Sequence, residues 1–464
     1  MKKDPAGVYE KMDYKSKEYY RNKIKELSEE TKISEVYIAN KCLDLALNVS
    51  FHETFNAKQT HIGYYLISDG IDELRKEIVG AADLSRPGTC GQVPMQHRVG
   101  KYILYNFILT AILSTLFGAY IYRECMNAAV SIITFILIFI PVSEICIQLI
   151  NYILSKKVKP KLIPKLDFSG GIPEEAAAFV IIPTLIKSKE KVKELIKKLE
   201  VYYLANKSDN IYFALLGDCS ECKNEEEDFD EEIIETGLQE IEKLNAKYDT
   251  ETWKSPLAKG GMSQSDRGDL TRPISRFHFL YRKRKWNPSQ KCYMGWERKR
   301  GLICDFNIFL TDRKDNFRVN TIAEGEIPDI QYVITLDSDT NLVLGSAAEL
   351  IGAAAHILNK PVTDASKNTV IEGYGIIQPR VGIDLVSSRK SLFTKIYGGL
   401  GGTNLYENAV SDVYQDNFDE GIFTGKGIYN LKVFNEVLNN RIPENTVLSH
   451  DLLEGNYLRC RSCN

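Results

Sequence analysis

The pattern of apolar and polar residues divides the chain into regions of different periodicity. Up to about residue 100, apolar residues recur at helical spacing with Lys and Glu between them, most clearly in Tyr9–Leu27 and Ile33–Leu47. From Ala176 onward, short β-branched runs alternate with amphipathic stretches, as in Ala177–Pro183 followed by Ser188–Leu199. We therefore predict an N-terminal helical region over 1–100 and an α/β domain with a mostly parallel sheet over 176–464.

Two long apolar stretches separate these regions. Tyr102–Tyr122 carries no charge over roughly 20 residues, enough to cross a bilayer core. Met126–Leu154 is a second such stretch, interrupted by Pro141. Five lysines then follow within 155–165, so the positive-inside rule places both ends of the pair in the cytoplasm. We predict a two-helix membrane hairpin over 101–155 and a basic linker over 156–175; the alternative is a buried hairpin of a soluble domain.

One strand of the α/β region ends in a pair of carboxylates. The buried run Tyr332–Leu336 is followed directly by Asp337, Ser338 and Asp339. Open α/β sheets bind ligands at the carboxyl ends of their strands, and a divalent cation can neutralise two neighbouring carboxylates. Asp337 and Asp339 are therefore predicted to hold Mg²⁺ or Mn²⁺ against a diphosphate. The alternative is an ordinary acidic turn.

Other polar residues supply the parts that a sugar-nucleotide transferase needs. Asp218 ends the second predicted strand and could accept a hydrogen bond from a uracil N–H. Arg298, Lys299 and Arg300 could meet the diphosphate. Asp451, late in the chain, could take the proton of an acceptor hydroxyl. Each has a plainer alternative: a solvated loop carboxylate for Asp218, a solvated basic patch for the Arg-Lys-Arg run, and a helix cap for Asp451.

Composition narrows the class of protein. With 59 Lys and Arg against 62 Asp and Glu, the net charge is −3, which gives no basic field for nucleic acid. Ten cysteines include the CxxC pairs Cys219/Cys222 and Cys460/Cys463, but no His stands at zinc-finger spacing, so reduced thiols are expected rather than zinc. The charged N-terminus is not a secretory signal.

Six segments resemble one known family, the cyclic β-1,2-glucan synthases, over residues 100–459. They are PKLDFSGGIPEE (164–175), VIIPTL (180–185), RKRKWNPSQKCYMGWERKRG (282–301), YVITLDSDTNL (332–342), IIQPRV (376–381) and SHDLLEG (449–455).

The resemblance implies a type-A glycosyltransferase fold and inverting transfer of glucose from UDP-glucose to a β-1,2-glucan acceptor at the inner, cytoplasmic membrane. It implies that Asp337 and Asp339 hold the metal, that Asp451 is the base, and that Glu454 in the same motif is a second catalytic residue. It further places Gln378 and Arg380 on the acceptor side.

The sequence departs from the family pattern in three places. Residues 251–275, rich in Gly, Ser and basic residues, look like an insertion. Leu302 follows Gly301 where a basic residue is expected. Family members also continue well beyond the position at which this sequence stops, so we expect an N-terminal fragment whose activity alone is in question.

Two alternative functions remain open on the sequence. One is a synthase of another β-glycan such as cellulose or chitin, although the Gln-x-x-Arg-Trp motif of those families is not in this sequence. The other is a non-catalytic, membrane-anchored fragment that binds nucleotide sugar. Residues 397–403 and Phe423–Ile428 are further candidates for loops near donor or acceptor, with flexible turns as the alternative.

Overall fold

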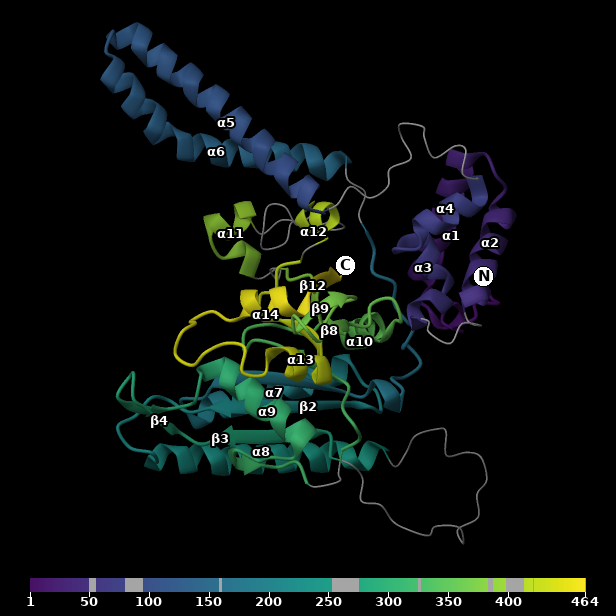
Figure 1. Ribbon diagram of the computed structural model, residues 1–464. Coiled ribbons are helices and arrows are strands. Elements are labelled where there is room, and N and C mark those ends of the chain that lie inside the picture. The colour runs from purple at the N-terminus through teal and green to yellow at the C-terminus, as the bar shows by residue number, and fades with distance from the viewer. Residues whose placement is uncertain are drawn as a thin grey trace.

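A computed structural model of the chain contains an N-terminal helical region, a long helical hairpin and an α/β domain (Figure 1). The structure describes residues 1–49, 56–79, 95–157, 161–252, 275–323, 327–382, 387–397, 413–419 and 421–463. Most of the predicted insertion at 251–275 and of the Gly-rich segment at 397–403 lies outside these residues.

An eight-stranded sheet forms the centre of the α/β domain, in the order β12-β10-β11-β7-β1-β2-β3-β6. The four central strands β7, β1, β2 and β3 run parallel, and β11 runs antiparallel between β7 and β10. The prediction of a mostly parallel sheet is confirmed. The strands are β1 Ala178–Leu185, β2 Ile211–Asp218, β3 Phe277–Arg282, β6 Phe317–Asn320, β7 Tyr332–Thr335, β10 Ile376–Pro379, β11 Gly427–Asn430 and β12 Cys460–Cys463.

Helices cover both faces of this sheet because alternate side chains of its buried strands point to opposite sides. In β1, Val180 and Ile182 pack against α7, α8 and α10, whereas Phe179 and Ile181 pack against α9 and α13. The apolar stripe of each helix thus has a sheet face to cover. These helices are α7 Lys189–Ala205, α8 Asp228–Thr252, α9 Arg298–Asp312, α10 Ser346–Ala355, α13 Leu431–Leu438 and α14 Asp451–Leu458.

Short elements decorate the domain. The antiparallel pair β4/β5 precedes α9, and the pair β8/β9 precedes β10. The apolar stretch Val370–Pro379 does not form one continuous strand, because Gly373, with φ +66°, separates β9 from β10. The bounds are β4 Lys285–Asn287, β5 Cys292–Met294, β8 Val362–Asp364, β9 Thr369–Glu372, α11 Leu392–Tyr397, α12 Val413–Phe418, η3 Glu174–Ala176 and η5 Ser387–Arg389.

The N-terminal helical region has its own apolar core and is joined by backbone hydrogen bonds to the segment that leads into the α/β domain. Met12 and Leu166 form a β-bridge, and the backbone N–H of Asp167 donates to the Lys11 carbonyl at 2.8 Å. The predicted linker therefore runs as a paired segment along the joint between the two parts. The helices here are η1 Tyr9–Lys11, α1 Tyr14–Thr31, α2 Glu35–Val49, η2 Ala57–Thr60, α3 Ile62–Ile67 and α4 Ile71–Val79.

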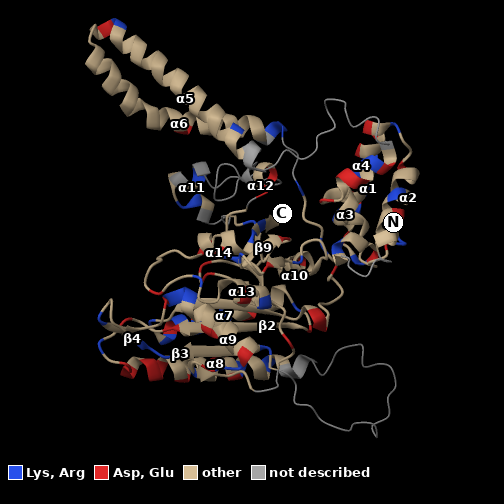
Figure 2. Cartoon of the chain, viewed as in Figure 1, with Lys and Arg blue, Asp and Glu red and all other residues tan. Residues whose placement is uncertain are grey.

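Two long helices, α5 Met95–Cys125 and α6 Ala128–Lys157, form the hairpin. Figure 2 shows that the hairpin is nearly free of charge between its tip and its base. Both helices are long and apolar enough to cross a membrane, and little of either is buried inside the protein: 17% of the most apolar part of α5 and 11% of that of α6. Core helices would be mostly buried, so the exposed apolar surface favours the membrane prediction over a soluble core hairpin.

Candidate active site

A cavity of about 840 Å³ opens at the carboxyl ends of β1, β2 and β7. This is the edge at which open α/β sheets bind ligands. Five of the predicted site residues line this cavity, namely Asp218, Arg298, Lys299, Asp337 and Asp339. The structure therefore brings together residues that are far apart in the sequence, as the alternation of strands and helices predicted.

The loop that carries the two aspartates is held from behind by α7. Lys198 donates from Nζ to the Ser338 carbonyl at 2.7 Å, and the Tyr202 hydroxyl donates to the Thr340 carbonyl. Leu336 is fully buried beneath the loop. Asp337 is half-buried at the floor of the cavity, and Asp339 is exposed at its mouth.

Two lysines neutralise Asp337. Lys299, from the first turn of α9, bonds to Oδ1, and Lys426, just before β11, bonds to Oδ2 at 2.7 Å. Burial raises the pKa of this carboxyl, but the hydrogen bonds and charges of the two ammonium groups outweigh burial and hold its pKa below the usual range. Asp337 is thus kept ionised in a cluster that is cationic overall.

Asp218 is part of a buried ion pair that the sequence did not reveal. Its Oδ1 accepts from Arg282 Nε at 2.8 Å and from the Cys219 N–H at 2.8 Å, while Oδ2 accepts from Arg282 Nη2 at 3.0 Å. Gly295 allows this packing, because a Cβ there would lie 2.0 Å from Asp218 Oδ1. One lone pair of Oδ2 still lacks a partner among these contacts, so the proposed bond from a uracil N–H requires that atom.

The start of α9 forms the opposite wall. Glu297 and Arg298, which precede and begin the helix, both have a left-handed backbone, with φ +52° and +50°, a strained arrangement that is often found at functional sites. Arg298 lies at the rim and pairs with Glu221 at 2.6 Å. Arg300 does not line the cavity. Its side chain is buried against Glu297, so it cannot contact a ligand in the cavity.

Residues 424–426 join this cavity to the remaining predicted residues. Gln378, buried in β10, accepts from both the backbone N–H and the hydroxyl of Thr424, at 2.7 and 3.0 Å. Lys299 Nζ donates to the Gly425 carbonyl at 3.4 Å, and Lys426 reaches Asp337. Gln378 therefore holds this segment in place, while Arg380, which follows β10, is half-buried.

Asp451 lies against the same segment, at the first position of α14. A Cβ on Gly425, which has φ +77°, would lie 2.8 Å from Asp451 Oδ1. That oxygen is buried and accepts no hydrogen bond in the described part of the chain. This carboxylate oxygen is therefore available to accept a hydrogen bond from an incoming group.

His450 and Glu454 flank Asp451. Glu454 Oε1 lies 2.8 Å from His450 Nδ1, and the same nitrogen lies 3.7 Å from Asp451 Oδ1. The Glu454 side chain is only 5% exposed. The structure therefore places Glu454, predicted as catalytic, behind the histidine, where it can orient the imidazole.

The donor groups suit a hard divalent cation. Mg²⁺ takes oxygen ligands and often binds one or two carboxylates together with substrate phosphates and water. Asp337 and Asp339 share one cavity and Asp337 is held ionised, so the pair fits such an ion. Lys299 and Lys426 are bonded to the two carboxylate oxygens of Asp337. For Asp337 to hold an ion, these lysines would have to release it and pair with the phosphates.

Two residues at this site were missed or undervalued in the sequence. Lys426 stands in the Phe423–Ile428 segment, which was only a weak candidate, and nothing in the local pattern connects it with Asp337. Arg282 ends β3 and was not among the predicted site residues, although its side chain is only 1% exposed. A charged residue within an otherwise buried strand was the available signal.

Comparison with curated proteins supports the resemblance. The chain is 33% identical over 460 residues to the cyclic β-(1,2)-glucan synthase NdvB of Rhizobium meliloti (strain 1021), a match that covers 97% of this chain. The chain is a relative of the cyclic β-1,2-glucan synthases. It spans 15% of the length of that relative. No protein-family model matches the chain.

Proposed function

We propose that the chain transfers glucose from UDP-glucose to a growing β-1,2-glucan, with inversion at the anomeric carbon. The observation that carries the proposal is the convergence of Asp337 and Asp451 on residues 424–426, because it brings a diphosphate-binding edge next to a base. Relationship to a cyclic β-1,2-glucan synthase supports glycosyl transfer in β-glucan synthesis. The fold would be of the glycosyltransferase type A.

In this proposal the cavity at the strand ends binds the donor. Asp218 Oδ2 receives the uracil N–H, and Arg298, Lys299 and the N-terminus of α9 face the diphosphate. Asp337 and Asp339 would hold Mg²⁺ or Mn²⁺, which, when bound, would offset the charge that develops on the departing UDP.

Transfer needs a single displacement. Asp451 takes the proton of the acceptor 2-hydroxyl, the acceptor oxygen forms a bond with the anomeric carbon, and the bond from that carbon to the phosphate oxygen breaks. The electron pair of the broken bond leaves with UDP, where Lys299 and Lys426 stabilise it. An α-linked donor then gives a β-linked product without a covalent enzyme intermediate.

The acceptor would approach from the side of Asp451. Gln378 acts there by fixing Thr424, and Arg380 lies beyond the end of the same strand. The hairpin of α5 and α6 would anchor the domain at the inner membrane, with the lysines that follow α6 on the cytoplasmic side.

The test is UDP release from UDP-glucose by the chain in membranes, followed by linkage analysis of the product. We expect release that depends on a divalent cation and is lost in Asp339→Asn, because the ion would lose one of its two carboxylate ligands. The matched control is Asp329→Asn, at an exposed carboxylate outside the cavity. Metal-independent release, or an Asp339→Asn variant as active as the parent, contradicts the proposal; UDP binding without any transfer indicates a non-catalytic fragment.

A further inference from the structure

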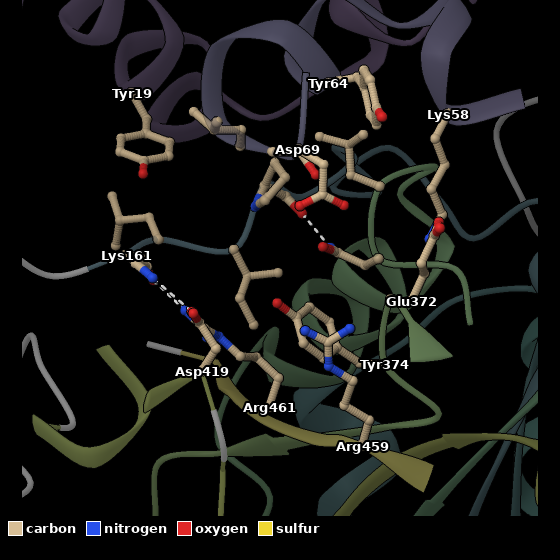
Figure 3. Close-up of a pocket in the computed structure, with 18 of the residues that line it drawn as sticks. Tyr19, Lys58, Tyr64, Asp69, Lys161, Glu372, Tyr374, Asp419, Arg459 and Arg461 are labelled. Carbon is tan, nitrogen blue, oxygen red and sulfur yellow. Dashed lines mark hydrogen bonds and ion pairs between the residues drawn. The ribbon is translucent and has the colours of Figure 1, made fainter. Parts of the chain in front are cut away.

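A second cavity, of about 420 Å³, lies where the N-terminal helical region meets the α/β domain (Figure 3). Tyr19 of α1 and Lys58 of η2 line one side, and Arg459 and Arg461, at the start of β12, line the other. The linker contributes Lys161. The cavity shares no lining residue with the donor cavity, and its volume is within the range of small-molecule sites.

Arg461 is buried in this wall with part of its guanidinium unsatisfied. The residue is 3% exposed, Nη2 donates to the Lys161 carbonyl at 3.3 Å, and Nη1 lies 3.6 Å from Asp419. Its Nε has no hydrogen-bond partner in the part of the chain that the structure describes. A buried charged donor without a partner is costly, so an acceptor inside the cavity would stabilise it.

Lys58 and Arg459 add two further positive charges that are poorly compensated. The Lys58 side chain is 8% exposed and its ion pair with Glu372 is long, at 3.7 Å. Arg459 forms no ion pair within the described residues; it packs on the Tyr374 ring and donates to the Ile371 carbonyl at 2.7 Å. Burial lowers the pKa of Lys58, Glu372 opposes that shift, and Arg459 adds to it.

The acidic residues of the cavity do not cancel these charges from within. Asp419 is already engaged by Lys161 at 2.6 Å, and Asp69 is exposed. Figure 3 shows the Tyr19 ring directed from α1 into the space above Lys161. Burial raises the pKa of Tyr19 to about 12, so its hydroxyl remains a donor. The interior therefore presents donors on several sides, and two of its three carboxylates, Asp419 and Glu372, are already paired with lysines.

We propose that this cavity binds a phosphate-bearing ligand, held by Lys58, Arg459 and Arg461. Guanidinium groups match phosphate in a bidentate manner, and the lysine adds a point charge. Because Lys58 comes from the N-terminal region and both arginines from the α/β domain, the ligand bridges the two parts. Occupancy would strengthen their docking.

The test is equilibrium dialysis of radiolabelled inorganic phosphate against the full chain in a neutral detergent, with chelator present. We expect saturable binding that weakens roughly tenfold or more in Lys58→Gln and in Arg459→Gln, since each removes one charged donor. Arg441→Gln is the matched control, because Arg441 packs on the Tyr457 ring outside the cavity. Circular dichroism of each variant establishes that it is folded.

The donor cavity also carries cations, so the same titration is made with Lys299→Met. Binding that survives this change but not Lys58→Gln belongs to the cavity at the joint, whatever the outcome for glycosyl transfer. A second titration in nanodiscs shows which kind of ligand carries the phosphate. Competition by phosphatidic acid in the nanodisc identifies a lipid headgroup, and a lack of competition identifies a soluble ligand. No saturable binding, or binding indifferent to Lys58→Gln and Arg459→Gln, overturns the proposal.

Discussion

Asp337 and Asp451 lie on two sides of the same short segment, yet their surroundings are opposite. Both oxygens of Asp337 are paired with ammonium groups, whereas Oδ1 of Asp451 is buried without a hydrogen-bond partner among the described residues. A carboxylate surrounded by cations stays charged and is suited to organising other charges. A carboxylate oxygen without a partner is available to accept a hydrogen bond from a substrate hydroxyl. The difference supports the proposal that Asp337 organises charge at the donor cavity and that Asp451 serves as the base.

The largest effect is expected from removing the base. Asp451→Asn should lower glucose transfer by about 10²–10⁴-fold, because an amide cannot take the proton of the acceptor hydroxyl. UDP binding, measured by calorimetry, should be unchanged, since Asp451 neither lines the donor cavity nor, unlike Lys426, pairs with a residue that does. Asp329→Asn is the control for the substitution itself. If Asp451→Asn reduced UDP binding as much as transfer, Asp451 would act in donor binding, as Asp337 does, and not as a base.

A smaller effect is expected from weakening the cation cluster around Asp337. Lys426→Met should reduce affinity for UDP about tenfold, because one charged hydrogen bond to the diphosphate is lost. Lys432→Met, a change at the exposed second residue of α13, serves as the control. Affinity for UDP equal to that of the parent would show that Lys426 neutralises only Asp337.

The same variant has a consequence for acid stability. A depressed carboxyl pKa contributes stability above the ordinary value of 3.8, and this contribution is lost as the pH falls through the folded-state pKa. Lys426→Met removes part of the depression, so acid unfolding should begin at a higher pH than in the parent. The two unfolding curves, followed by circular dichroism, should converge well below pH 3.8.

The smallest effect is expected from replacing a glycine, and two glycines with a similar left-handed backbone conformation can be compared. Gly425 and Gly345 have φ +77° and +73°, but a Cβ would meet the Asp451 carboxylate only at Gly425. Both Ala variants should lose about 1 kcal/mol of stability from left-handed strain. Only Gly425→Ala should also lower transfer, roughly fivefold, because it shifts the base away from its substrate. Equal activities of the two variants would show that the position of Asp451 does not depend on Gly425.

The sequence predicted the ligand-binding edge better than its internal contacts. The run Tyr332–Leu336 before Asp337 and Asp339 sufficed, because a buried strand and the end of a parallel sheet follow from local pattern. The pairing of Asp218 with Arg282 did not, because ion pairs across strands depend on the order of strands in the sheet. Arg300 shows the same limit: two neighbours in one helix turn, Lys299 and Arg300, face the cavity and the interior respectively.

The long-range placement of the N-terminal helical region was also beyond the local pattern. Its helices could be predicted from spacing, but the bridge between Met12 and Leu166 joins segments on either side of the hairpin. That contact depends on where the hairpin returns the chain. The cavity at the joint depends on it too, so nothing in the local pattern predicted that Lys58 and Arg461 would line one cavity.

The reversed direction of β11 has one more consequence. Because β11 runs against β7, with Gly427 opposite Thr335, its beginning lies at the edge where β7 ends. Because Lys426 directly precedes Gly427, the register between β11 and β7 places its side chain next to Asp337. A change that shifted the pairing of β11 with β7 by one residue would therefore displace Lys426 from Asp337, even with every residue of the cavity left unchanged.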